Sequence, residues 1–155
     1  MIQKKLTVFA LALFISVLVG NCGEGGSTPF VVSDSNLSGV IGGLDWEFVQ
    51  GDTDAFFADE EHHAKLYSSS YTACEPFGPS EPKVLVRLPK TPGEYLLGAN
   101  RSATFFEPPG ENTIVMEGRL EVYEVSDTVI KAGLHAVFDS LYTVNGRFEV
   151  EICTE

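Results

Sequence analysis

Apolar and polar residues alternate along most of the chain after residue 36, with the period of two that half-buried β-strands produce. The longest alternating run covers residues 114–123. Its expected buried face carries Ile114, Met116, Leu120 and Val122, and charged side chains dominate the other face. The run therefore predicts one long strand with a single face in the core.

Shorter alternating segments repeat this pattern, and turn-forming residues separate them. The further strands are expected at residues 40–41, 44–49, 65–69, 84–88, 94–97, 103–106, 130–138 and 148–152. Eight or nine strands of this kind, without a convincing helix, predict an all-β domain. We expect an antiparallel β-sandwich, with a small barrel as the alternative architecture.

Two segments leave their local structure open. Asn145 and Gly146 form the dipeptide most typical of a two-residue hairpin, but a strand that follows a turn at Asp139 and Ser140 would also contain them. Residues 52–67 begin with acids that resemble a helix cap, yet their apolar positions do not keep the 3.6-residue period. For this segment we expect a loop followed by a strand.

The N-terminal region has a different pattern. Lys4 and Lys5 precede an apolar run over residues 6–19, which is too short for a comfortable bilayer span and is typical of an export signal. The sequence LVGNC follows, and its cysteine is Cys22. This segment resembles the bacterial lipobox, which implies that Cys22 is diacylated and becomes the N-terminus of a membrane-anchored lipoprotein. The alternative is an ordinary secretory signal that leaves Cys22 as a free thiol.

The lipobox resemblance divides the chain into three parts. Residues 1–21 are the expected signal peptide, residues 22–36 a flexible tether rich in Gly and Ser, and residues 37–155 the folded domain. Gly23 rather than Asp follows the cysteine, which in the resembled lipoproteins implies export to the outer membrane. We therefore expect a cell-envelope protein that contacts its membrane through the N-terminal lipid.

Acidic residues outnumber basic residues by a wide margin. The chain has 10 Lys and Arg against 22 Asp and Glu, a formal net charge of −12. Removing residues 1–21 takes away two lysines and no acid, so the mature charge is 8 − 22 = −14. This charge argues against nucleic acid and anionic lipid headgroups as partners, because both require a basic footprint.

With Cys22 assigned to the lipid, two cysteines remain, Cys74 and Cys153. In an exported protein such a pair is most simply a disulfide. The bond would tie an early loop to the last strand, and the restricted unfolded chain would stabilise the fold by about 4.5 kcal/mol at most. A metal site on these two thiolates is not expected, because no CxxC motif or suitably spaced histidine accompanies them.

Five consecutive residues carry groups that bind metals. They are Asp59, Glu60, Glu61, His62 and His63. Carboxylates suit hard cations and imidazoles suit zinc, so a metal-assisted hydrolase is one hypothesis for the function. Neighbouring histidines in a strand point to opposite faces, however, and a solvated acidic loop is the simpler interpretation.

Two phenylalanine pairs are the second candidate binding feature: Phe56 with Phe57, and Phe105 with Phe106. In a strand, one member of each pair must face away from the core. An outward-facing ring would suit a platform for a sugar or a peptide. Core packing is expected for most other aromatic residues, including Trp46, which lies in an alternating strand.

The mature sequence as a whole resembles small exported bacterial lipoproteins whose single β domain has no assigned activity. The resemblance rests on G-x-x-G-G-x-x-W at residues 39–46, on residues 66–74, on P-x-x-x-G-x-Y-x-L at residues 89–97 and on V-N-G-x-F-x-V-x-x-C at residues 144–153. These motifs contain no catalytic residues. Together with the anchor they favour a non-catalytic binding or scaffolding module without a cofactor, whose partner is an envelope protein or a glycan. A purely structural envelope protein is the alternative besides the hydrolase.

Overall fold

The computed structural model of the protein describes residues 30–54 and 61–154. In these residues the chain forms strands and no helix, so none of their segments is a helix that would cross a membrane. The strands are β1 (Ser38–Ile41), β2 (Leu44–Glu47), β3 (Gln50–Thr53), β4 (Glu61–Tyr67), β5 (Lys83–Pro89), β6 (Gly93–Leu96), β7 (Ala103–Glu107), β8 (Glu111–Val115), β9 (Gly118–Val125), β10 (Val129–Val137) and β11 (Thr143–Glu151). The all-β prediction is confirmed.

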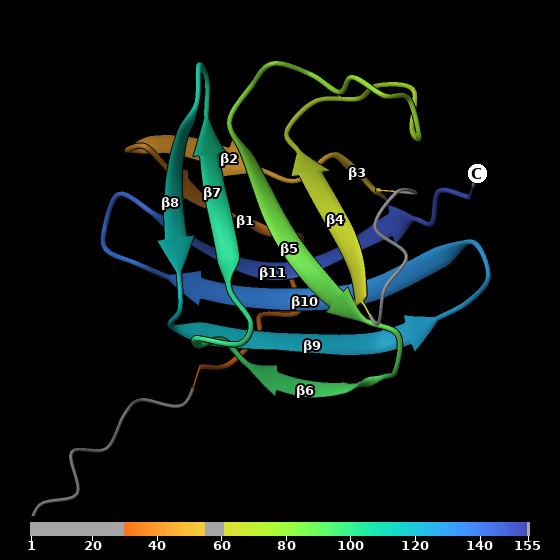
Figure 1. Ribbon diagram of the computed structural model, residues 1–155. Helices are drawn as coiled ribbons and strands as arrows, with labels where there is room; N and C mark the ends of the chain where they lie inside the picture. The colour runs from red at the N-terminus through yellow and green to blue at the C-terminus, as the bar shows by residue number, and fades with distance from the viewer. Residues whose placement is uncertain (1–29, 55–60, 155) are drawn as a thin grey trace, which may run out of the picture.

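All the strands belong to one hydrogen-bonded sheet, whose main path runs β6-β9-β10-β11-β3-β4-β5-β7-β8. The β1–β2 hairpin branches from this path because β1 also pairs with β11. Every pairing is antiparallel except that of β11 with β3, where Glu151 pairs with Asp52. The two ends of the path, β6 and β8, do not pair with each other, so the curled sheet forms a half-barrel (Figure 1).

The sheet curls so that its two halves face each other. We call β4, β5, β7 and β8 the front half and β6, β9, β10 and β11 the back half, as they lie in Figure 1. The strands of the front half cross those of the back half, and β3 connects the two. Because the hydrogen bonding is continuous, the expected sandwich of two sheets is not confirmed.

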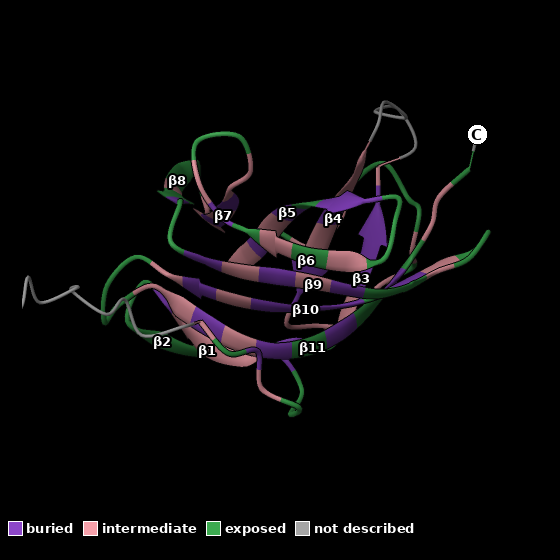
Figure 2. Ribbon diagram, turned by 90° about the horizontal axis from the view of Figure 1, so that it is seen from below, coloured by how far each residue is buried: buried purple, intermediate pink, exposed green. Residues whose placement is uncertain are grey.

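The core lies between the two halves. On β5, Val84, Val86 and Leu88 are at most 3% exposed, and on β10 the same alternation buries Ile130 and Leu134 completely. These side chains belong to one apolar cluster. Figure 2 shows buried positions recurring along β9, β10 and β11. The alternation in the sequence therefore identified the buried faces of these strands.

The expected single strand over residues 114–123 is in fact two strands, β8 and β9. The chain passes from the front half to the back half between them. Gly118 begins β9 with a φ of +147°, and a Cβ there would lie 2.0 Å from the carbonyl oxygen of His135. Ile114 and Met116 precede this corner and are 56% and 54% exposed, so the prediction that they face the core is wrong.

The last hairpin turns just after β10. Asp139 Oδ1 accepts hydrogen bonds from the amides of Leu141 and Tyr142 at 2.8 and 3.0 Å. Asn145 and Gly146 lie inside β11, which confirms the second alternative for this segment. The strand expected near residue 65 is also present, as β4, although it begins four residues earlier.

Residues 30–36, which we expected to be part of the flexible tether, lie on the back half, and we call them the strap. The amide of Ser33 donates to Asn145 Oδ1 at 2.8 Å, and Asn145 Nδ2 donates to the carbonyl of Val31 at 3.1 Å. The amide of Arg147 donates to the carbonyl of Ser35 at 2.8 Å. Because β11 pairs with the strap through these bonds, the folded domain begins before residue 37.

Gly133 of β10 provides the space that the strap occupies. A methyl group at this position would lie 2.5 Å from Val32 Cγ1 and 2.6 Å from the hydroxyl of Tyr123. Because such contacts force the strap to shift, we expect Gly133→Ala to lower the free energy of unfolding by about 1–3 kcal/mol, measured by urea denaturation. Gly110→Ala is the matched control, since its methyl group would meet no atom within 4 Å.

A double-mutant cycle separates this contact from a general effect of alanine in β10. Val32→Ala removes the atom nearest to the new methyl group, so the cost of Gly133→Ala should be smaller in that background. An equal cost in both backgrounds would show that the strap does not sit on Gly133.

Candidate functional site

Several of the site residues predicted from the sequence lie outside the described residues. These are Cys22, Phe56, Phe57, Asp59 and Glu60. Glu61, His62 and His63 are the first three residues of β4, and Glu61 forms an ion pair with Arg101. Within residues 30–54 and 61–154, no cluster of three metal-binding side chains includes any of them. The metal cluster of residues 59–63 therefore stays a prediction.

Phe105 and Phe106 point to opposite faces of β7, as adjacent strand residues must. Phe105 is fully buried, and its ring stacks on that of Tyr142 with the centroids 6.0 Å apart. Phe106 is partly exposed, and the Nζ atom of Lys83 lies 4.8 Å from its ring centroid. Phe105 is thus excluded from any binding platform because the core surrounds its ring, whereas Phe106 is available.

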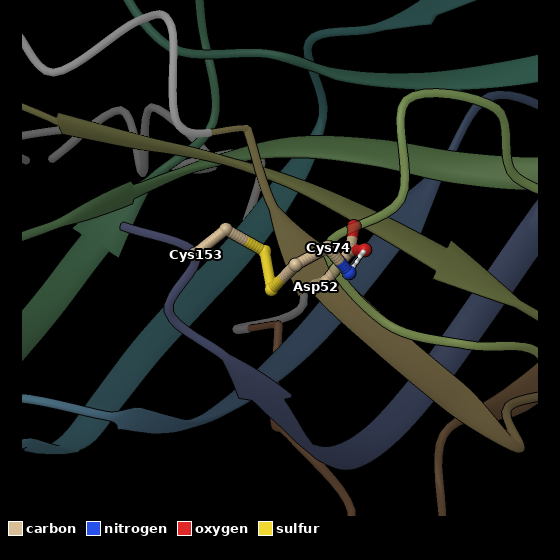
Figure 3. A group of neighbouring side chains, drawn as sticks. All are labelled: Asp52, Cys74 and Cys153. Atoms are coloured by element: carbon tan, nitrogen blue, oxygen red, sulfur yellow. Dashed lines mark hydrogen bonds between the residues drawn. A yellow bond between two sulfur atoms is a disulfide. The ribbon is translucent and has the colours of Figure 1, made fainter. Parts of the chain in front are cut away.

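Cys74 and Cys153 form the expected disulfide (Figure 3). The carboxylate of Asp52 lies beside it, where Oδ2 accepts a hydrogen bond from the amide of Cys74 at 2.7 Å and Oδ1 lies 3.2 Å from Lys65 Nζ. The carboxylate and the two sulfur atoms are close enough to share a metal ion. The sulfur atoms are bonded to each other, however, and Asp52 is fully buried and paired, so this cluster holds the fold together.

Tyr67 and Tyr71 pack against each other next to Asp52, with their ring centroids 4.7 Å apart. Burial raises the pKa of both phenols, and the negative charge of Asp52 raises it further, to about 12 for Tyr67. The amide of Tyr71 also donates to Gln50 Oε1 at 3.0 Å. The two tyrosines are therefore neutral at physiological pH, where they pack around the buried carboxylate.

An open groove of about 590 Å³ lies where the end of β5 meets the start of β6 and the loop before β7. The lining residues are Glu61, Arg87, Pro89, Lys90, Thr91, Tyr95 and Arg101. Gly98 and Arg101 exchange two backbone hydrogen bonds, of 2.7 and 3.2 Å, and this tight turn returns the chain toward β6. The guanidinium carbon of Arg101 consequently lies 4.6 Å from the ring centroid of Tyr95.

Both members of this stack are held in place. The hydroxyl of Tyr95 donates to the carbonyl of Thr91 at 2.8 Å, which ties the ring to the β5–β6 turn. The guanidinium of Arg101 forms its ion pair with Glu61 of β4. The stack therefore presents a fixed planar cation at one wall of the groove.

The other two cations of the groove are not neutralised. Arg87 and Lys90 are exposed, and neither forms an ion pair in the part of the chain that the structure describes. Burial, and then the charge of Lys90, lowers the pKa of the neighbouring His62, so this imidazole is mostly neutral at pH 7. Among the described residues, the groove thus combines two cations that form no ion pair with a rigid arginine–tyrosine stack.

Basic residues are concentrated on one side of the molecule. Of the eight Lys and Arg residues that the structure describes, five lie on β4, on β5 and in the loops on either side of β6: Lys65, Lys83, Arg87, Lys90 and Arg101. The remaining three belong to the back half, where Arg119 pairs with Glu94 and Glu121, Lys131 with Glu124, and Arg147 with Asp34. A second groove of about 560 Å³, on the back half, therefore contains only paired cations.

The groove cations Arg87, Lys90 and Arg101 were not predicted from the sequence. They come from separate segments, and no motif connects them. One signal was present, because four of the ten basic residues fall within residues 83–101, together with a single acid. The large negative charge of the whole chain concealed this local excess.

Comparisons with protein-family models, curated proteins and solved structures find no match for this chain. The function is therefore inferred from the geometry and the charge of the groove. Both come from residues that the structure describes.

The raised pKa of Tyr67 has a consequence at alkaline pH. The phenol has a pKa of about 10 in the unfolded chain and about 12 in the folded protein, so the folded state holds the proton more tightly. This contribution to stability is fully present below pH 10 and is lost as the pH rises toward 12. We expect the free energy of unfolding to fall over that window, and Tyr67→Phe to make the fall less steep.

Denaturant unfolding at a series of pH values measures this effect. Tyr95→Phe is the matched control, because it removes a phenol of β6 whose hydroxyl donates to the carbonyl of Thr91. A slope that Tyr67→Phe leaves unchanged would contradict the assigned environment of Tyr67.

Proposed function

We propose that the protein is a non-catalytic binding module of the cell envelope, anchored to the outer membrane by a lipid on Cys22, and that it binds an anionic ligand in the groove. One observation carries the binding site: Arg87 and Lys90 are exposed and form no ion pair among the described residues, on a chain whose net charge is −12. A carboxylate or phosphate between them would accept charge-assisted hydrogen bonds, which are stronger than those between neutral groups. Anion binding would also relieve the repulsion between the two cations.

The stack of Arg101 on Tyr95 would orient such a ligand. Its guanidinium is already held by Glu61 and by the aromatic ring, so little side-chain freedom is lost when a ligand binds. A fixed guanidinium favours planar anions, because its parallel N–H groups match the two oxygens of a carboxylate. We therefore expect a preference for carboxylates over spherical anions of the same charge.

The lining of the groove favours binding over catalysis. The one carboxylate among the described lining residues, Glu61, is paired with Arg101, and the lining contains no serine, cysteine or histidine. The hydrolase hypothesis needs His62 and His63 to reach one ion, but they are consecutive in β4 and their side chains point to opposite faces. We therefore do not propose an enzymatic activity.

The strap would bring the domain closer to the membrane than a flexible tether ending at residue 36. If Cys22 carries the lipid, only residues 23–29 separate it from the strap, and seven extended residues span at most about 25 Å. The strap lies on the back half, whereas Arg87 belongs to the front half. We expect the back half to lie toward the headgroups and the groove to be open to the surrounding compartment.

The anchor is tested by replacing the acylated residue. Cys22→Ala should move the exported protein from the membrane fraction to the soluble fraction, because its attachment depends on the acyl chains. Asn21→Gly is the control, since it keeps the cysteine and places a residue more common in lipoboxes before it. Mass spectrometry of the mature N-terminus reads the modification directly, and a wild-type N-terminus without acyl chains would rule the anchor out.

The groove is tested with glucuronate, a sugar that carries one carboxylate. Arg87→Ala combined with Lys90→Ala should weaken its binding at least about tenfold, because hydrogen bonds to charged groups contribute about 1.5–3 kcal/mol each. Isothermal titration calorimetry at low ionic strength measures the affinity, which should decrease as salt is added. Lys131→Ala, on the back half, is the matched control for the loss of a basic residue.

An unchanged affinity in the groove variant would show that the anion binds elsewhere. A wild-type protein that binds neither glucuronate nor inorganic anions would favour the purely structural alternative.

A further inference from the structure

The outer face of the front half carries a second cationic position besides the groove. Tyr67, Lys83 and Phe106 are neighbours across three strands, because Lys83 of β5 pairs with Tyr67 of β4 and with Phe106 of β7. Tyr67 is 1% exposed, so Phe106 is the ring of the pair that a ligand can reach. The Nζ atom of Lys83 lies 5.0 Å from the ring centroid of Tyr67 and 4.8 Å from that of Phe106. We call these three residues the aromatic shelf.

The ammonium group of Lys83 forms no ion pair among the residues that the structure describes. Burial and the neighbouring charge of Lys65 lower the pKa of Lys83, and Glu81 opposes this effect. Lys65 itself is paired with the buried Asp52. The shelf therefore has the same character as the groove, namely a positive charge that a ligand anion would neutralise.

The shelf and the groove lie along a single strand. Arg87 is four residues from Lys83 on β5, and both side chains face outward, so about 13 Å separates their positions in the sheet. Between them on this face lie Leu85, Thr104 of β7 and Ser102 before β7, and the neighbour of Leu85 on β4 is Lys65, whose charge is paired with Asp52. A ligand that spans both positions would thus meet a charge at each end and hydroxyl and apolar groups in the middle.

We propose, as a refinement that rests on the function proposed above, that the ligand is an acidic oligosaccharide lying along β5 from the groove to the aromatic shelf. One carboxylate occupies the groove at Arg87 and Lys90, and a second one, further along the glycan, meets Lys83. The sugar ring above the shelf packs on Phe106, whose face combines an apolar surface with a neighbouring cation. Thr104 and Ser102 are positioned to bond to sugar hydroxyls.

The same features argue against other polymers. β4, β5 and β7 have strand neighbours on both sides, so this face offers side chains and no free backbone edge, whereas extended peptides are commonly bound by adding a strand to an edge. Nucleic acid carries closely spaced phosphates and requires a continuous basic footprint, whereas the outward face of β5 offers two separate cationic positions. An acidic glycan fits this face because two of its carboxylates, a few sugar units apart, can reach two cationic positions about 13 Å apart.

Galacturonate and a series of its oligomers, titrated into the lipid-free mature protein, test this arrangement. We expect the affinity to rise at least tenfold once the oligomer is long enough to reach from Arg87 to Lys83. Lys83→Gln should remove this gain and leave the affinity for the monomer unchanged. Arg87→Ala with Lys90→Ala should weaken the binding of every length, and Lys131→Ala should change neither.

The outcomes separate the two proposals. Monomer binding that depends on Arg87 and Lys90, without a gain from length or without an effect of Lys83→Gln, would overturn the extended site and leave the groove proposal intact. Loss of dependence on Arg87 and Lys90 at every length would overturn both.

A charge-conserving variant and uncharged oligomers test whether the charge of Lys83 and the carboxylates of the ligand produce the gain. Lys83→Arg keeps the charge and should retain most of the gain from length, which distinguishes binding from damage to the fold. Methyl-esterified oligomers should lose the gain, because they are uncharged. An acidic peptide of matched length and charge that binds as tightly would overturn the assignment to a glycan.

Discussion

A single hydrogen-bonded sheet must bury its apolar face against itself, and the rest of the structure follows from this constraint. The chain supplies no helix among its described residues to cover the sheet, so the inward side chains of β5 and β7 can be shielded only by those of β9, β10 and β11. Curling the sheet achieves this burial. It also turns the other face of each half outward. The outward face of the back half carries the strap, and the outward face of the front half carries the cations.

The curl is fixed where the two halves join at β3. The ladder is weak at this seam, because β11 and β3 share one residue pair. Other interactions reinforce it: Cys153 is bonded to Cys74, its amide donates to Thr53 Oγ1 at 3.0 Å, and Asp52 bonds to the amide of Cys74. A buried carboxylate is costly unless it is paired. The contacts of Asp52 with Lys65 and Cys74 therefore make the seam specific as well as stable.

The sequence predicted the parts of the fold that depend on local alternation. Two strands with one buried face were predicted correctly, at Val84 to Leu88 and at Ile130 to Leu134. Each has one face in the core, so its apolar residues alternate with the others. The corner at Gly118, where the chain passes from β8 to β9, was missed. The apolar residues keep their spacing of two across this corner, so the sequence shows no break between the two strands. The strap was missed because it packs on Gly133 of β10, which is about a hundred residues away in the sequence.

The same distinction applies to the candidate site. The cysteine pair was predictable, because the export signal and the acylated Cys22 expected from the sequence leave two thiols to pair. The outward position of one phenylalanine of the pair at 105–106 followed from the strand period, but which ring would be free did not. The groove could not be predicted, because what distinguishes Arg87 and Lys90 is that neither forms an ion pair among the described residues, and pairing depends on how distant strands align.

The central claim is that the cations of the front half that form no ion pair among the described residues bind an anion. The most direct measurement is an NMR titration of the isotope-labelled mature domain with galacturonate oligomers, following the backbone amides. The account predicts saturable shifts at Arg87, Lys90, Tyr95 and Arg101 that extend toward Lys83, with β9, β10 and β11 unaffected. Shifts centred on the strap and the back half, or no saturable shifts at all, would contradict it.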